Sequence, residues 1–230
     1  PTYGIPLDME SLIEVARDRG VWVIEDCCLA LGAKYKGKLL GQFGDAAYWS
    51  FQWNKPMTTG LGGMLGTDNR ELASQLEEIF ASEACAPENL ESAVLALERQ
   101  AHRWLVTPRT APMARYLFRQ LSYRGLAVGS SENEEFDVSM PSKFFKLMSS
   151  GQARAGLNRL KSMEKNIEHR KKIAKLYGEL LESIGWPSVN LPSAYEPVFV
   201  TYPVRVAEKD AVLEQAPREM IEIGSWFESP

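Results

Sequence analysis

The sequence has few of the residues that build metal sites or disulfide frameworks. Its 230 residues include three cysteines and two histidines. Cys27 and Cys28 are adjacent, Cys85 stands in a polar stretch, and no CxxC or His/Cys spacing is present. The pattern therefore indicates neither a zinc site nor a disulfide-stapled fold. Unpaired cysteines in an ordinary chain are typical of a reducing compartment, so we expect a cytoplasmic protein.

Long apolar runs and an excess of basic residues are also missing. No apolar stretch approaches the roughly 20 residues that a membrane span requires. The first four residues lack the basic segment and apolar core of a secretory signal. The net charge of −4 argues against a role in binding nucleic acid. The composition, 45% hydrophobic and 24% charged, is that of an ordinary soluble globular protein.

The N-terminal pattern predicts a helix followed by a buried strand. Asp8 is a suitable N-cap, apolar residues recur at helical spacing from Leu12, and Gly20 fits the end of the helix. Residues 21–24 form a continuous apolar run of the kind found in parallel strands that are buried on both faces. The run ends at the acidic pair 25–26. Helix, tight turn and buried strand together predict an α/β unit.

The rest of the chain continues this alternation before it becomes mainly helical. Strands are expected at 46–51 and 63–67, after an irregular crossover at 27–45. Asp68 can cap the helix that follows. Further helical patterns cover 85–139, with polar breaks and a loop at 129–135, and 149–184. A strand at 198–206 and a helix at 209–223 complete the prediction.

The two ends of the chain bear on its completeness. The sequence begins at Pro1 without Met and stops at Pro230, so we expect a fragment of a longer protein. An incomplete sheet would leave an unpaired edge and exposed apolar surface. We therefore expect the isolated chain to be unstable or to aggregate.

Three side chains that can carry chemistry follow the ends of predicted strands. Asp26 lies where ligands bind in open α/β sheets, although it could equally cap the next turn. Ser50 lies near the end of the next strand, and Lys55 lies in the loop after it. Burial favours the neutral amine of a lysine, which can form a Schiff base with an aldehyde. By itself, however, Lys55 reads as an ordinary solvated lysine.

Taken together, these residues fit the requirements of pyridoxal 5'-phosphate. That cofactor needs a lysine for its aldehyde carbon, a carboxylate opposite its pyridine nitrogen, and donors for its phosphate. Lys55, Asp26 and Ser50 are the corresponding residue types. The glycine-rich stretch 60–63 has neither Walker nor GxGxxG spacing, so we interpret it as a turn that lets the backbone pass close to the site.

The first 70 residues contain an ordered set of short motifs. They are Tyr3-Gly4 through Asp8-Met9, Val23-Ile24-Glu25-Asp26, Gly44-Asp45, Ser50-Phe51 with Lys55, and Thr59-Gly60-Leu61-Gly62-Gly63-Met64. This set resembles the DegT/DnrJ/StrS family, fold-type-I aminotransferases that act on nucleotide-linked keto sugars. Residues 148–153 and 157–160 resemble the interdomain helix of that family, whereas 85–140 match poorly.

The resemblance implies an α/β fold: an incomplete fold-type-I PLP-transferase large domain, mainly a parallel sheet flanked by helices, with the start of a small α+β domain. Residues 1–145 would be part of the PLP-binding large domain, 146–185 the interdomain helix, and 186–230 part of the C-terminal small domain. The site would need no metal, and a homodimer with sites at its interface is expected.

The resemblance also implies the roles of the candidate residues. Lys55 would carry the cofactor and move the proton between carbon atoms. Asp26 would pair with the pyridine nitrogen, and Ser50 would bind the cofactor phosphate. An amino donor, usually glutamate in this family, would load the amine onto the cofactor, and the ketone of a nucleotide-linked sugar would then accept it.

Other functions remain open at this point. Leu29 stands where the family has Gln or His, and no Asn-x-Arg signature is evident at 145–147, which favours a non-catalytic or regulatory relative. A dehydratase that uses the same cofactor replaces the lysine, so Lys55 argues against that class. A plain doubly wound domain that binds small molecules would leave the combination of Asp26, Ser50 and Lys55 unexplained.

Overall fold

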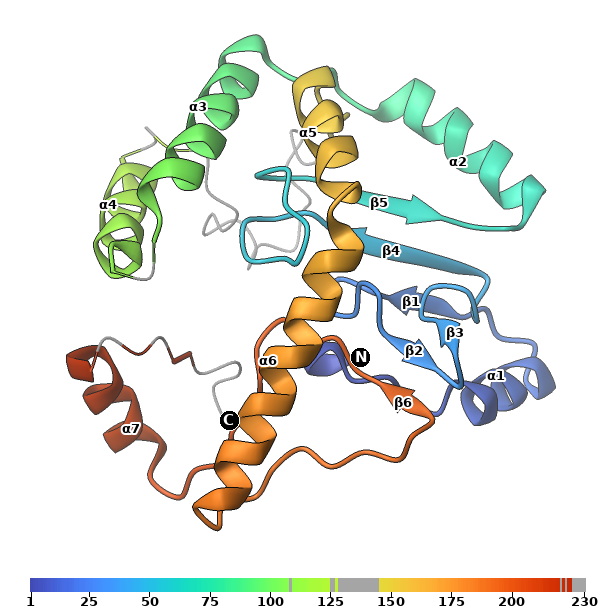
Figure 1. Cartoon of the computed structure of the whole chain (residues 1–230). Helices are drawn as coiled ribbons and strands as arrows, with labels where there is room; N and C mark the ends of the chain where they lie inside the picture. The colour runs from blue at the N-terminus through green and yellow to red at the C-terminus, as the bar shows by residue number, and fades with distance from the viewer. Residues whose placement is uncertain (108, 125–126, 128–144, 220, 222, 225–230) are drawn as a thin grey trace.

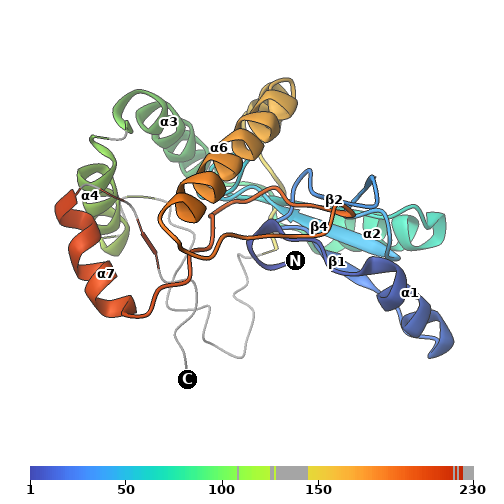
Figure 2. The ribbon, with the colours of Figure 1, turned by 60° about the horizontal axis from the view of Figure 1, so that its bottom comes forward.

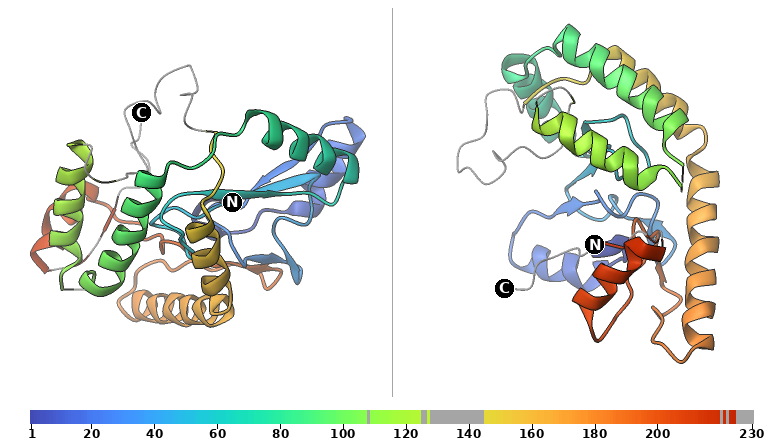
Figure 3. Two further views of the ribbon diagram at one scale, coloured as in Figure 1. Left: turned by 90° about the horizontal axis from the view of Figure 1, so that it is seen from above. Right: turned by 90° about the vertical axis from the view of Figure 1, so that its left-hand side faces the viewer.

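The computed structural model describes residues 1–107, 109–124, 127, 145–219, 221 and 223–224. Figures 1 and 2 show the long helix α6 (Met163–Ser183) between the strands on one side and α7 (Lys209–Gln215) on the other. The views in Figure 3 place α3 (Asn89–Leu105) and α4 (Ala111–Tyr123) near one end of α6. Within the described residues, no helix is long and apolar enough to cross a membrane.

The first sheet has the strand order β1-β4-β5. β1 (Ile24–Asp26) runs parallel to β4 (Ala46–Ser50), and β5 (Gly63–Gly66) runs antiparallel to β4. The strands predicted at 46–51 and 63–67 are therefore confirmed. The first strand begins at Ile24 rather than at residue 21.

The predicted burial of residues 21–24 on both faces is wrong. Val21, Trp22 and Ile24 are 60%, 65% and 63% exposed and belong to neither core cluster. An apolar run indicates that a strand is suited to burial. It does not indicate whether this chain supplies a helix or strand that covers the apolar side chains. Exposed apolar surface of this kind is consistent with the expected self-association of the isolated chain, which stays a prediction.

A second, antiparallel sheet joins distant parts of the chain in the order β3-β2-β6. β2 (Lys34–Tyr35) and β3 (Lys38–Leu39) form a hairpin in the crossover before β4, and β6 (Tyr195–Glu196) pairs with β2. Residues 195–196 thus lie against the part of the chain assigned to the large domain. The division into domains at 145 and 185 stays a prediction.

The strand predicted at 198–206 is wrong, because this segment packs against the N-terminal turn η1 (Thr2–Gly4) instead of pairing. The Val198 N–H donates to the Gly4 carbonyl at 3.2 Å, and Val198 is only 1% exposed. A Cβ atom on Gly4 would lie 2.1 Å from the Val198 carbonyl oxygen. The approach of these two segments therefore requires glycine at position 4.

Several helix boundaries differ from the predicted ones. Asn69, not Asp68, caps α2 (Arg70–Glu83), because its side chain accepts from the N–H groups of the first turn. The helix predicted over 149–184 is two helices, α5 (Ser150–Leu160) and α6, separated where the Ser162 N–H bonds the Arg159 carbonyl. The helical pattern over 85–139 is confirmed in α3 and α4, whereas the loop predicted at 129–135 lies outside the described residues.

The helix predicted over 209–223 is shorter than expected. α7 ends at Gln215, and a 3-10 turn, η3 (Ala216–Glu219), follows it. Pro217 has no N–H and so cannot continue α-helical hydrogen bonding. The predicted end at residue 223 is therefore wrong.

Two core clusters lie between α6 and the sheets. Trp49 and Ile167 pack against both clusters, so β4 and α6 connect them. One cluster contains Met9, Cys27, Ala30, Ala33, Tyr35, Leu40, Ala47 and Val198, and the other contains Phe51, Met57 and Met163.

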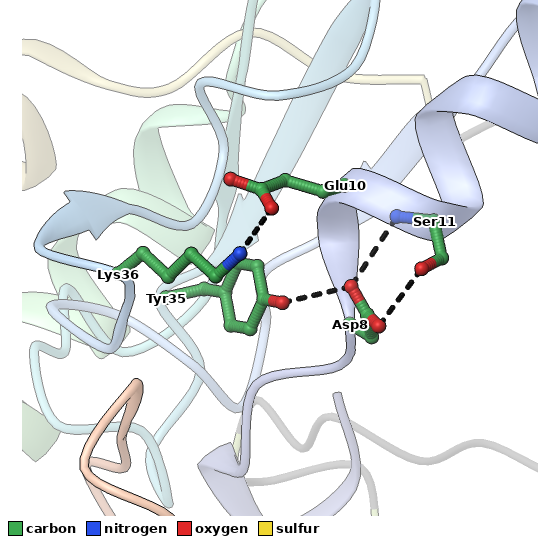
Figure 4. Close-up of polar contacts among 5 residues, drawn as sticks. All are labelled: Asp8, Glu10, Ser11, Tyr35 and Lys36. Carbon is green, nitrogen blue, oxygen red and sulfur yellow. Dashed lines mark hydrogen bonds and ion pairs between the residues drawn. The ribbon is translucent and has the colours of Figure 1, made fainter.

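Helix α1 (Met9–Asp18) begins at a polar cluster that also holds β2 (Figure 4). As predicted, Asp8 caps the helix: its Oδ1 accepts from the Ser11 N–H at 3.2 Å. The same oxygen accepts from the Tyr35 hydroxyl at 2.8 Å, while Lys36 pairs with Glu10. The bond from Tyr35, with those from Ser11, lowers the pKa of Asp8. The Asp8 bond in turn raises the pKa of Tyr35 to about 12.

We predict that Tyr35→Phe lowers the melting temperature of the purified protein within a limited pH window. Because the pKa of Asp8 is lowered, its stabilisation is present above its ordinary value of 3.8 and is lost as the pH falls through the folded value. Because the pKa of Tyr35 is raised, its stabilisation is present below pH 10 and is lost as the pH rises towards 12. Melting curves across pH should show the difference from wild type shrink at both extremes. The control, Tyr177→Phe, changes an exposed ring on α6; equal shifts in both variants would contradict this prediction.

Candidate active site

The acidic pair that ends β1 directs its two carboxylates to opposite faces, as alternation along a strand requires. Asp26 is exposed, whereas Glu25 is only 6% exposed. Oε1 of Glu25 accepts from the backbone N–H groups of Phe43 (2.6 Å) and Gly44 (2.8 Å). Oε2 of Glu25 accepts from the backbone N–H of Gly41 at 2.7 Å. Glu25 therefore holds the turn that leads into β4.

The Gly-Asp pair that follows fixes the position at which β4 begins. Oδ2 of Asp45 accepts from the Val23 N–H at 2.7 Å. A Cβ atom on Gly44 would lie 2.5 Å from the Val23 carbonyl oxygen, so a side chain there would push the two segments apart. The resulting register places Asp26 opposite Tyr48.

Asp26 is held as a carboxylate by its neighbours. Its Oδ1 accepts from the Cys28 N–H at 2.9 Å. Partial burial acts to raise the pKa of Asp26, but hydrogen bonds from the Cys28 N–H, the Cys28 thiol and the Tyr48 hydroxyl lower it overall. Burial, followed by the bond to Asp26, raises the pKa of Tyr48 to about 12. Asp26 is thus an ionised acceptor and Tyr48 a neutral donor at neutral pH.

Cys28 follows Asp26 and is half-buried. Burial and its bond to Asp26 raise the pKa of the Cys28 thiol to about 12, whereas the charge of Lys55 and the backbone of Ser50 act to lower it. Because β1 and β4 run parallel, Asp26 and Ser50 end their strands at the same edge of the sheet, and Lys55 follows in the loop after β4. A neutral, half-buried thiol is a poor nucleophile, so Cys28 serves as a contact within the site.

Ser50 ends β4 opposite Gly63 of β5 and is half-buried. Its Oγ lies 3.5 Å from the Gln52 backbone nitrogen, a long and weak contact in which the oxygen accepts. The hydroxyl hydrogen can therefore donate to an anion.

Lys55 lies on the loop of residues 51–62 between β4 and β5 and is half-buried. The backbone N–H of Lys55 donates to the Gln52 carbonyl at 3.1 Å. Side chains from α3, α5 and α6 hold carbonyl groups of this loop. They are Arg99, which donates to Thr59 at 3.3 Å, Gln152, which donates to Leu61 at 3.0 Å, and Asn166, which donates to Pro56 at 2.8 Å.

The helices α3 and α4, which carry none of the recognised motifs, also cover this loop. The ring of Trp53 lies 5.5 Å from that of His102 and 6.3 Å from that of Phe118, measured between centroids. Burial, with the nearby charge of Arg159, lowers the pKa of His102. The sequence carried no signal for these contacts, nor for the three loop donors, because each joins residues far apart in the chain.

The donor set fits a pyridine aldehyde that carries a phosphate. An ionised carboxylate can accept from a pyridinium N–H, a serine hydroxyl can donate to a phosphate, and a lysine amine can bond an aldehyde carbon. Among the described residues, no group of His, Cys, Asp and Glu side chains could hold a metal ion. Leu29 is half-buried, and its place against a cofactor ring stays a prediction.

Comparison with known proteins agrees with this chemistry. The family model described as the DegT/DnrJ/EryC1/StrS aminotransferase family matches residues 1–98 and 107–230. The chain belongs to this aminotransferase family. The resemblance carried by its motifs is thereby confirmed.

Individual members of the DegT/DnrJ/EryC1/StrS family match shorter stretches. GDP-perosamine synthase from Escherichia coli O157:H7 is 53% identical over 70 residues, which cover 30% of this chain and 19% of that protein. A protein named pleiotropic regulatory protein from Geobacillus stearothermophilus is 44% identical over 78 residues, covering 34% and 21%.

The fold is also that of solved family members. A DegT/DnrJ/EryC1/StrS aminotransferase from Brucella abortus superposes with a TM-score of 0.63 at 20% identity, covering 95% of this chain and 46% of that one. The predicted α/β fold of the type-I PLP-dependent aminotransferases is thereby confirmed. The chain spans less than half the length of that structure, and its matches to the two curated relatives cover 19% and 21% of their lengths.

We predict that Glu25→Gln destabilises the purified protein by about 3 kcal/mol, because the amide turns an NH₂ donor toward at least one of the three backbone N–H groups and leaves the remaining bonds without a charged acceptor. Urea unfolding measures the change. Glu14→Gln on the exposed face of α1 is the control and should change the free energy of unfolding by less than about 0.5 kcal/mol. A Glu25→Gln variant as stable as this control would show that the carboxylate does not hold the turn.

Proposed function

We propose that this chain forms the catalytic part of a PLP-dependent enzyme that transfers an amino group to the ketone of a nucleotide-linked sugar. The observation that carries the proposal is that Asp26 and Ser50 end two parallel strands at the same edge of the sheet, with Lys55 in the loop that follows. Membership of an aminotransferase family supports the same reaction class.

Each of the three residues has one role in this proposal. Lys55 would hold pyridoxal 5'-phosphate through its aldehyde carbon, Asp26 would accept from the pyridinium N–H, and Ser50 would donate to the phosphate. When bound, the cofactor supplies an electron sink for the electrons of a substrate C–H bond. Nζ of Lys55 would take up that proton and return it to the carbon on the other side of the substrate nitrogen.

Asp26 suits its role because its neighbours stabilise the charged form. Hydrogen bonds from Cys28 and Tyr48 outweigh partial burial and lower its pKa, so the carboxylate stays ionised at neutral pH. An ionised carboxylate keeps a facing pyridine nitrogen protonated, which is the state in which the ring withdraws electrons.

The substrates follow from relatives rather than from the site. The name GDP-perosamine synthase supports a sugar joined to a nucleotide. Glutamate as amino donor and a homodimer are proposed from the family resemblance alone. A cytoplasmic setting is proposed from the three free cysteines, Cys27, Cys28 and Cys85.

A second candidate is a regulatory relative that binds the cofactor without turnover. The likeness to the pleiotropic regulatory protein favours it, as does Leu29 in place of a hydrogen-bonding side chain. The presence of Lys55, Asp26 and Ser50 together favours the enzyme.

We predict that the purified protein, mixed with pyridoxal 5'-phosphate, gains a visible absorption band that borohydride removes while fixing the cofactor to Lys55. Peptide mass spectrometry locates the modified lysine. Lys55→Ala should abolish both signals, whereas Lys172→Ala, on an exposed part of α6, should leave them unchanged. Failure to modify Lys55 in the wild-type protein contradicts the proposal.

Added glutamate then separates the two candidates. An aminotransferase should lose the band as glutamate loads its amine onto the cofactor. A band that persists with glutamate, and with other amino donors, supports the regulatory relative instead.

A further inference from the structure

The carbonyl group next to Lys55 is held by a short chain of hydrogen bonds that starts in the C-terminal segment. Pro56 is buried, and its carbonyl accepts from Nδ2 of Asn166 at 2.8 Å. A residue that precedes proline is restricted to extended conformations. Fixing the Pro56 carbonyl therefore limits the directions in which the Lys55 side chain can leave the loop.

Arg170 determines which way the Asn166 amide points. The two residues lie one turn apart on α6, and Nε of Arg170 donates to Oδ1 of Asn166 at 3.0 Å. With Oδ1 engaged by a donor, Nδ2 is left to face the Pro56 carbonyl. A flipped amide would place its NH₂ group against the guanidinium and its oxygen against a carbonyl, and would lose both bonds.

The other end of the Arg170 side chain is fixed by the C-terminal segment. Its Nη1 donates to the carbonyls of Phe199 (3.0 Å) and Val200 (3.3 Å). Burial lowers the pKa of Arg170. Among the described residues, no carboxylate lies within ion-pair distance of Arg170, so neutral oxygens surround its charge. A guanidinium placed in this way acts through the geometry of its donors.

We propose that Asn166 and Arg170 are positioning residues, which set the Lys55 loop according to the placement of residues 199–200. Neither residue touches the reacting atoms. The importance of Lys55 rests on the proposed function, but the coupling between the C-terminal segment and the loop does not. Docking of the C-terminal segment then completes the site, because without it Arg170 loses two acceptors and Asn166 its orientation.

The test measures the reactivity of Lys55 in the cofactor-free protein. Competitive acetylation, read by mass spectrometry across pH, gives the rate and the pH midpoint for this one amine. Asn166→Asp keeps the side-chain volume and the acceptor for Arg170 but removes the donor to Pro56. We expect the acetylation rate of Lys55 in this variant to differ about tenfold from that in wild type, and its pH midpoint to move. A factor of about ten corresponds to the loss of one buried hydrogen bond.

Two further variants make the result specific. Asn158→Asp, an exposed asparagine on α5, should leave the Lys55 profile unchanged. Arg170→Met should move the profile as Asn166→Asp does, and the double variant Asn166→Asp/Arg170→Met should add nothing, because the residues act in series. A lower melting temperature with an unchanged Lys55 profile would reduce both residues to structural ones and overturn the proposal.

Addition of pyridoxal 5'-phosphate to the same samples keeps the two proposals distinguishable. If wild-type protein does not attach the cofactor at Lys55, the proposed function is contradicted. The acetylation profiles still test whether residues 199–200 are coupled to the Lys55 loop. If wild-type protein attaches the cofactor and the Asn166→Asp variant has the same Lys55 profile as wild type, only the proposed coupling is contradicted.

Discussion

Three backbone N–H groups of residues 41–44 converge on the buried carboxylate of Glu25, and the strand pairing that positions Asp26 depends on that contact. It fixes the turn before β4, and the bond from Val23 to Asp45 then sets the register in which β4 pairs with β1. That register sets Asp26 opposite Tyr48 and brings the end of β4, with Ser50, close to Cys28. The hydrogen bonds of the buried Glu25 carboxylate thus help to position the exposed carboxylate of Asp26, the next residue.

The lysine loop depends on a different part of the chain. Its carbonyl groups are held by Arg99, Gln152 and Asn166, which lie on three separate helices. β4 and β5 supply the ends of the loop, while the helices determine its path between them. Asp26 and Lys55 are therefore positioned independently, one by a sheet and the other by helices that pack around it. The proposed site therefore needs both parts of the chain in place.

The sequence predicted those features that local patterns encode. The cap at Asp8, the strands at 46–51 and 63–67, and the order of motifs around Lys55 each rest on neighbouring residues, and each agrees with the structure. Predictions of features that depend on contacts between distant residues were wrong, and some of these features were not predicted at all. Residues 198–206 have the composition of a strand, yet Val198 packs on Gly4 instead. The exposure of Trp22 and the roles of Glu25 and Asn166 depend on what packs nearby, which no local pattern records.

In the proposed site, Asp26 and Lys55 contact one and the same cofactor ring. A crystal structure of the purified protein with pyridoxal 5'-phosphate tests it directly. We expect continuous density from Nζ of Lys55 to the cofactor, with the pyridine nitrogen within hydrogen-bonding distance of Asp26 and the phosphate near Ser50. A cofactor bound elsewhere, or bound at Lys55 with its ring turned away from Asp26, would contradict it.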